Sequence, residues 1–289
     1  MTTLLVGFDS AWTPTNSGAL VGALRLSDGK FYELGPPQIV NFHEAERTIL
    51  DWQTDHVPTE TIVLLDQPTI VNNASGQRPV ENIVASPVSL RYGGIQPANT
   101  AREKMFGKEA PVWPFLTRFG GPADPLAPIG NTRVYETYPV LTLIALGWIL
   151  PDLRAAGRLP KYNPQRKKTF SISDWQYVCG LVSGVFRDRG LMDTVQWIGY
   201  AARNSLPRKN DQDRLDACLC LLVAIHLIEC KDCLMVGDCK TGYIVVPHSA
   251  ELLTELSARC NHTNRVPSEW VRVFKSRCLD VKPSQTSAE

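Results

Sequence analysis

The sequence predicts an α/β fold built around a mixed β-sheet with helices on its faces. Three apolar, strand-like stretches joined by short turns occupy residues 4–42, and a helical pattern then leads to a fourth apolar strand at 61–66. The short connections favour antiparallel pairing of the first three strands, whereas the helical crossover favours parallel pairing of the fourth. We expect one domain over residues 1–280.

The first elements follow from apolar periodicity and turn residues. Strands are predicted at 4–8, 18–26 and 31–42, with Ser27–Gly29 as the turn between the second and third. A helix is predicted over His43–Asp55 because apolar residues recur there at helical spacing. Thr61–Asp66 is a continuous apolar run of strand length, which is typical of a central parallel strand.

Residues 69–130 interrupt this pattern. They are rich in proline, glycine and asparagine, and a structureless loop of that length is unusual in a compact domain. We predict an insertion that covers one end of the sheet and contains short helices near 80–90 and 98–106. The insertion is either a lid or substrate-binding element or an elaborated edge of the sheet.

The remaining chain predicts a short strand followed by mostly helical structure. The strand is expected at 131–136 and helices at 140–150, 171–189, 192–204 and around Asp213–Ile225. Residues 242–247 fit a late strand or extended segment, 249–260 fit a further helix, and 281–289 fit a flexible tail. We therefore expect a C-terminal helical elaboration of the sheet.

Composition indicates an ordinary globular protein. The chain has 289 residues, of which 44% are hydrophobic and 20% charged, and its net charge is +1. This balance gives no overall basic surface for nucleic acid, so such a partner would need a local patch. No stretch approaches the roughly 18 apolar residues that span a bilayer, and no signal peptide is evident. We expect a cytoplasmic protein without a membrane partner.

Asp213 and Asp216 stand at the start of an otherwise apolar helix. Residues three apart share one helical face, so both carboxylates point the same way. A helix that is apolar nearly all round belongs in a core, and charges at its edge are costly unless a cation or donor meets them. A metal site is one interpretation, and capping of the helix by these aspartates is the other.

Three predicted strands also end in an acid, namely Asp9, Asp66 and Glu136. Sites in open α/β sheets lie beyond the carboxyl ends of the strands, so these side chains would converge if the strands are neighbours. Together with Asp213 and Asp216 they would form an oxygen-rich cluster suited to Mg²⁺ or Mn²⁺. Singly, each acid could instead cap the turn that follows its strand.

The cysteines suggest no strong metal motif. Cys179, Cys218 and Cys220 lie in apolar helical stretches and fit reduced core residues. Cys230 and Cys233 have CxxC spacing, but no second pair follows. A helix end with incidental thiols is favoured over a zinc site.

Five short motifs, in this order, resemble those of domain-of-unknown-function family 429, regarded as predicted ribonuclease H-like nucleases. They are Gly7–Trp12, Leu65–Pro68, Tyr135–Pro139, Asp213–Ala217 and Gly242–Pro247. The resemblance implies a ribonuclease H-like fold with a mixed five-stranded sheet, three antiparallel strands and then parallel ones. It implies that Asp9, Asp66, Glu136, Asp213 and Asp216 are catalytic metal ligands.

The implied activity is metal-dependent hydrolysis of phosphodiester bonds in nucleic acid, leaving a 5′-phosphate and a 3′-hydroxyl. Arg78 resembles an arginine of the family's post-strand loop, and Arg166 and Lys167 belong to a basic loop from Arg154 to Lys168 that could hold phosphates or be merely a solvated surface. Trp12, Trp113 and Tyr138 could stack bases or pack internally. The alternative is a non-catalytic module that binds a nucleotide, nucleic acid or protein; a phosphotransferase of the actin-like group ranks last, because glycine-rich phosphate loops are missing.

Overall fold

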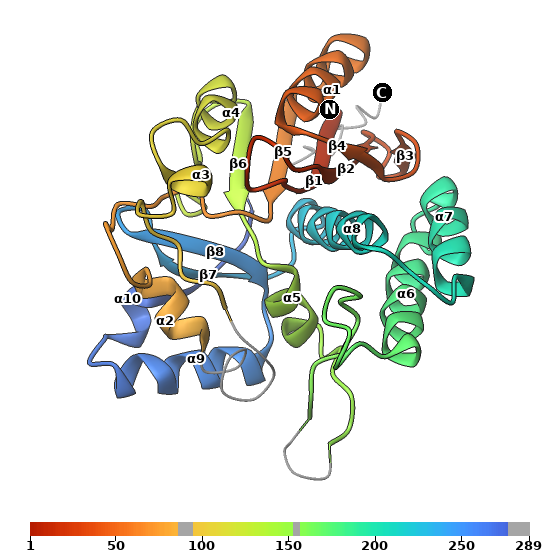
Figure 1. Cartoon of the computed structure of the whole chain (residues 1–289). Helices are drawn as coiled ribbons and strands as arrows, with labels where there is room; N and C mark the ends of the chain where they lie inside the picture. The colour runs from red at the N-terminus through yellow and green to blue at the C-terminus, as the bar shows by residue number, and fades with distance from the viewer. Residues whose placement is uncertain (86–94, 153–156, 277–289) are drawn as a thin grey trace, which may run out of the picture.

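The structure is a computed structural model that describes residues 1–85, 95–152 and 157–276 (Figure 1). Its main sheet contains β1 (Thr3–Asp9), β2 (Gly18–Arg25), β3 (Phe31–Glu33), β4 (Gln38–Val40), β5 (Glu60–Leu65) and β6 (Thr132–Glu136). The strand order is β3-β2-β1-β5-β6, and β4 also pairs with β2. The pairs of β2 are antiparallel, whereas β1–β5 and β5–β6 are parallel. The predicted α/β class with a mixed sheet is confirmed.

The sheet has six strands rather than the predicted five, because the third predicted strand is broken. Gly35, Pro36 and Pro37 separate β3 from β4. Gly35 adopts a left-handed conformation with φ 97°, and the two prolines have no N–H to donate to β2. The two short strands therefore pair with opposite ends of β2.

Helices α1 (Phe42–His56) and α4 (Val112–Arg118) pack on one face of the main sheet. A capping box starts α1, in which Asn41 Oδ1 accepts from the N–H of Glu44 at 2.9 Å while Glu44 accepts from the N–H of Asn41 at 2.8 Å. The rings of Phe8, Phe42 and Phe115 meet beneath these helices, with centroids 5.3–5.6 Å apart. Helix α4 of the insertion thus covers the α1 side, whereas Phe106 of α3 (Glu103–Phe106) packs with Val71 and Ala98 in a separate small cluster.

Helix α8 (Lys209–Ile228) covers the opposite face and is the central helix of the molecule. It packs on β1 and β2, and it also contacts α5 (Pro139–Ala145), α6 (Ile172–Arg187) and the second sheet. Helix α7 (Met192–Arg203) packs against α6. Neighbours on every side explain why the sequence of α8 is apolar all round, as predicted.

A second, three-stranded antiparallel sheet follows α8. It consists of β7 (Cys233–Asp238), β8 (Gly242–Pro247) and β9 (Val271–Phe274), in the order β8-β7-β9. Helices α2 (Pro79–Ala85) and α9 (Ala250–His262) pack on one face of it, and α10 (Pro267–Trp270) precedes β9. The late strand predicted at 242–247 is β8, but the C-terminal elaboration, predicted as helical, also contains the two unpredicted strands β7 and β9. The apolar run Leu234–Val236 is a strand that follows the helix end directly.

Some predictions lie outside the described residues, namely the tail at 281–289, Arg154 and the end of the helix predicted at 80–90. Within the described ranges, no helix is long and apolar enough to cross a membrane.

Candidate functional site

The aspartate that caps α8 is not one of the two aspartates of the predicted pair. Asp211, not Asp213 or Asp216, accepts from the backbone N–H of Arg208 at 2.8 Å and so closes the start of the helix. Asp213 and Asp216 lie beyond the first turn and are 3% and 5% exposed. Capping therefore does not account for them.

Asp9 and Asp66 are brought side by side by the register of the main sheet. Phe8 is paired with Leu65 in the parallel β1–β5 ladder, and the N–H of Asp66 donates to the carbonyl of Phe8 at 2.9 Å. The next residues along each strand are the two aspartates, on strands that run about 4.8 Å apart. Side chains alternate between the two faces of a strand, so Asp9 lies on the same face as Leu5, and Asp66 lies on the same face as Ile62 and Leu64. Leu5, Ile62 and Leu64 all pack on the α8 side of the sheet.

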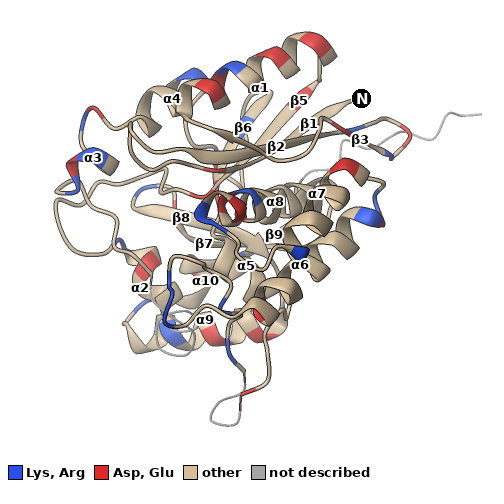
Figure 2. Cartoon of the chain, turned by 45° about the vertical axis from the view of Figure 1, so that its right-hand side comes forward, with Lys and Arg blue, Asp and Glu red and all other residues tan. Residues whose placement is uncertain are grey.

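Gly7 lets α8 approach that face closely. A Cβ at Gly7 would lie 2.1 Å from the carbonyl oxygen of Ala217 and 2.4 Å from the nitrogen of Leu221. The backbone of α8 therefore rests directly on β1, one turn from Asp216 and two residues from Asp9. Figure 2 shows the charged turns at the start of α8 at the middle of the molecule, beneath the main sheet.

Asp216 is held by two donors. The hydroxyl of Tyr162 donates to Oδ1 at 2.8 Å, and the side-chain amide of Gln212 donates to Oδ2 at 2.9 Å. Asp213 instead forms an ion pair with Lys209, one turn earlier in the helix. Asp9 Oδ2 is buried and has no hydrogen-bond partner among the described residues.

These acids lie close enough to shift one another's pKa values. Burial, followed by the charges of Asp66, Asp216 and Asp213, raises the pKa of Asp9 well above its usual value. Burial and then Asp216 raise the pKa of Asp66 in the same way. Burial raises the pKa of Asp216 to about 6, although Lys209 opposes the change. Burial and neighbouring like charges both disfavour the ionised carboxylates, so a bound cation would stabilise them in the ionised form.

Glu136 belongs to a different arrangement. Its Oε2 accepts from Arg78 Nη1 at 2.9 Å and from the N–H of Thr69 at 2.9 Å, and its Oε1 accepts from Arg78 Nη2 at 2.6 Å. Arg78 is only 1% exposed and also binds Glu81 and the carbonyl of Ile70. Arg78, predicted to bind substrate, therefore ties the insertion to β6, and Glu136, predicted as a metal ligand, is its partner.

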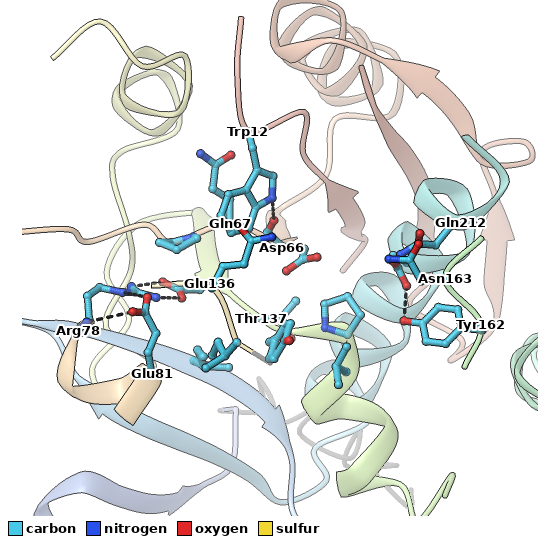
Figure 3. Close-up of a pocket in the computed structure, with 18 of the residues that line it drawn as sticks. Trp12, Asp66, Gln67, Arg78, Glu81, Glu136, Thr137, Tyr162, Asn163 and Gln212 are labelled. Atoms are coloured by element: carbon cyan, nitrogen blue, oxygen red, sulfur yellow. Dashed lines mark hydrogen bonds and ion pairs between the residues drawn. The ribbon is translucent and has the colours of Figure 1, made fainter. Parts of the chain in front are cut away.

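A pocket of about 210 Å³ opens between the acid cluster and the second sheet (Figure 3). Asp66 and Asp216 line it, together with residues from α8, the basic loop and the start of α5. Of the three residues predicted to bind substrate, Arg78 and Arg166 line the pocket, whereas the exposed Lys167 does not. Trp12 and Tyr138 also line it, but Trp113 packs inside the insertion and donates to the carbonyl of Gly107 at 2.7 Å.

Trp12 stands out in its backbone. It has a φ of 58°, in the left-handed region that residues other than glycine rarely adopt. Its indole N–H donates to the carbonyl of Asp66 at 2.9 Å. Backbone conformations of this kind concentrate at functional sites. The indole therefore fixes the end of β5 where Asp66 enters the pocket.

The acids suit a divalent cation in chemistry, although not yet in arrangement. Within the described part of the chain, no three Asp, Glu, His or Cys side chains are already grouped as metal ligands. Asp213 is already paired with Lys209, and Glu136 is already paired with Arg78. Asp9, with an oxygen that has no partner among the described residues, Asp66 and Asp216 remain as the hard oxygen donors that could hold Mg²⁺ or Mn²⁺.

Two contributors were missed from the sequence. Gln212 lies one helical turn before Asp216, which it contacts, so i,i+4 spacing could have indicated it. Tyr162 reaches Asp216 from a loop 54 residues away, and no local signal marks it.

The thiols lie elsewhere. Cys179, Cys218 and Cys220 are buried as free thiols in the core, as predicted, and Cys233 is a buried free thiol on β7.

Comparison of this chain with protein-family models, with curated proteins and with solved structures found no match.

Proposed function

We propose that this chain is a metal-dependent nuclease of the ribonuclease H-like type, with Asp9, Asp66 and Asp216 as its principal metal ligands. The observation that carries the proposal is the in-register pair Asp9 and Asp66, facing Asp216 across the Gly7 contact. One buried oxygen of this cluster lacks any partner among the described residues. Asp213 and Glu136 take part less directly, because each is paired with a cation.

The order of strands supports the fold part of the proposal. Strands β1, β3 and β4 each pair antiparallel with β2, and β5 and β6 then add in parallel beside β1. The resemblance to family 429 implies the same arrangement, and the motif acids Asp9 and Asp66 fall on adjacent strand ends. Membership of that family is part of the proposal.

The chain's own residues would divide the work as follows. Tyr162 and Gln212 fix both oxygens of Asp216, and Trp12 fixes the backbone of Asp66. Arg166, at the pocket, supplies a positive charge for a phosphate. A bound divalent cation would neutralise the phosphate and make a water more acidic, which is the chemistry that phosphodiester hydrolysis requires.

A cleavage assay tests the proposal. Labelled single-stranded, duplex, hybrid and branched nucleic acids are incubated with the protein and Mg²⁺ or Mn²⁺, beside the Asp9→Asn variant. We expect cleavage that needs the metal and is lost in Asp9→Asn. Absence of cleavage across this panel, or cleavage that Asp9→Asn retains, would overturn the proposal.

One observation favours the alternative of a non-catalytic binding module. Lys209 pairs with Asp213 and its charge also acts on Asp9 and Asp216, so the chain already supplies one cation to the cluster. The alternative predicts that Mn²⁺ does not raise the melting temperature of the wild-type protein, because no ion binds the native state.

A further inference from the structure

The pocket beside the acid cluster is a cleft between two layers and not an open sheet edge. Its lining includes Asp66 and Asp216 as well as Tyr138 at the start of α5 and Ile244 of β8. Figure 3 shows Asp66 between the Arg78–Glu136 ion pair and Tyr162. The second layer is fastened to the first, because Thr137 Oγ1 donates to the carbonyl of Val245 at 2.8 Å and β6 packs against β8. The second sheet therefore limits what can reach the acids.

The walls carry three kinds of recognition chemistry. Acids occupy one end, and the exposed Arg166 adds a cation for phosphate. Half-buried Tyr138 and Trp12 supply ring surfaces. The remainder of the lining mixes the Arg78–Glu136 ion pair, apolar residues such as Pro139 and Val140, and polar side chains such as Asn163 and Gln212.

Gln212 points independently to a ligand. It is 8% exposed, and its amide nitrogen is used by Asp216. Its Oε1 is buried and has no partner in the described part of the chain. A buried acceptor left without a donor is costly, so a ligand N–H or O–H that reaches it gains a hydrogen bond without displacing a protein contact.

From this combination we propose that the pocket takes a single nucleotide unit, with its phosphate toward Asp66, Asp216 and Arg166 and its base against Tyr138. This inference rests on the proposed function, because it takes the acid cluster as the reacting end. The source of the unit is either a free nucleotide or an unpaired nucleotide of a strand.

The consequence is selection against intact duplex. The cavity of about 210 Å³ is smaller than the 300–1,000 Å³ typical of sites for drug-sized ligands, so it has room for one nucleotide unit at most. A paired base would first have to leave its stack, which costs a few kcal/mol in a duplex and much less in a single strand. Unpaired strands and strand ends are therefore the favoured substrates.

A binding measurement on the full chain tests this. Fluorescence anisotropy, at one fixed salt concentration and with Ca²⁺ in place of Mg²⁺, compares a labelled single strand with the blunt duplex of the same sequence. We expect the single strand to bind at least about tenfold more tightly. Nucleoside 5′-monophosphates should compete if free nucleotides are a source, whereas inorganic phosphate alone should compete weakly.

Matched variants locate the binding. Tyr138→Ala should weaken single-strand binding by about tenfold, and Tyr138→Phe, which keeps the ring, should restore most of it. Tyr32→Ala, which removes an exposed tyrosine on β3 outside the pocket, should have no effect. Near-ultraviolet circular dichroism of Tyr138→Ala checks that the variant is folded.

The outcomes separate the two proposals. Equal affinity for duplex and single strand, or no loss in folded Tyr138→Ala, would overturn this inference even if metal-dependent cleavage occurs. Selective single-strand binding at Tyr138 without cleavage would support the pocket and overturn the nuclease proposal.

Discussion

Two groups of buried acids lie at the ends of neighbouring strands of the main sheet, and they differ in whether each carboxylate has a cation or hydrogen-bond donor as its partner. At β6, Glu136 has both oxygens bound by Arg78, and Glu81 completes the network. At β1 and β5, Asp9 has an oxygen with no partner among the described residues, and burial together with neighbouring acids raises the pKa of both Asp9 and Asp66.

The difference teaches which carboxylates are structural. A buried charge with a complete set of partners fixes the fold, whereas a buried charge without one costs stability and points to a ligand. The Arg78 network joins the insertion, β6 and the loop around Ile70. The aspartate cluster joins β1, β5 and α8. Both groups reach the pocket, the aspartate cluster through Asp66 and Asp216 and the network through Arg78, Glu81 and Glu136.

The largest expected effect is on the Arg78 network. Arg78→Met leaves Glu81 and Glu136 buried without a cation, so the free energy of unfolding should fall by about 3–5 kcal/mol. Urea denaturation measures it. Arg158→Met, which breaks the more exposed ion pair with Asp174, is the matched control and should cost about 1 kcal/mol or less. Equal losses in the two variants would remove the distinction drawn here.

The second effect separates activity from stability. Asp9→Asn should lower the cleavage rate by about 100-fold or more while leaving stability equal or higher, because it removes a repelled buried charge. Glu136→Gln should do the reverse, losing stability while each folded molecule keeps most of its activity. Cleavage rates normalised to the folded fraction decide the matter. If Glu136→Gln is as inactive as Asp9→Asn, Glu136 belongs with the catalytic acids.

Much of this arrangement could be predicted from the sequence. Apolar runs placed β1, β5 and β6, and each ended in the acid observed there. Spacing placed Asp213 and Asp216 on one face of a buried helix, which α8 confirms. The broken strand at Gly35 was also foreseeable, because two prolines follow it.

The pairing of charges could not be predicted, because it depends on strand parity and on distant loops. By the alternation of side chains along a strand, Glu136 follows the face of Val134, which packs on the α1 side, whereas Asp66 follows the face of Leu64, which packs on the α8 side. In β6 each face carries one polar and one apolar residue before Glu136, with Thr132 and Val134 on one face and Arg133 and Tyr135 on the other, so the sequence does not reveal which face packs on the core. Arg78 reaches Glu136 over 58 residues, and no periodic pattern encodes that contact.

The third effect concerns pH. Burial raises the folded-state pKa of Asp216 to about 6, above its usual value of 3.8, so the folded protein binds the proton more tightly between these values. Stability from this group is therefore full below about pH 4 and is lost as the pH rises to about 6. Without divalent metal, Asp216→Asn should be more stable than wild type at pH 7, by on the order of 1–3 kcal/mol, and equal to it near pH 4.

Thermal melts of both proteins from pH 4 to pH 8 measure that difference. Asp28→Asn is the control, because the pKa of the exposed Asp28 is lowered by the backbone N–H of Lys30 and so gives no loss of stability with rising pH. A constant gap between wild type and Asp216→Asn across the range would show that the Asp216 carboxylate is not strained by its surroundings.

The smallest effect tests whether Lys209 already serves the cluster as a cation. Lys209→Met removes the partner of Asp213 and a charge that acts on Asp9, so without metal the melting temperature should fall by about 2 °C. Mn²⁺ should then raise the melting temperature of Lys209→Met more than that of wild type, because the ion meets acids that no lysine neutralises. Lys240→Met, at an exposed turn after β7, is the control and should match wild type in both conditions. If Mn²⁺ shifts Lys209→Met and wild type equally, Lys209 does not compete with the ion, and the acids at β1 and β5 are as open to metal in the native protein as they are without the lysine.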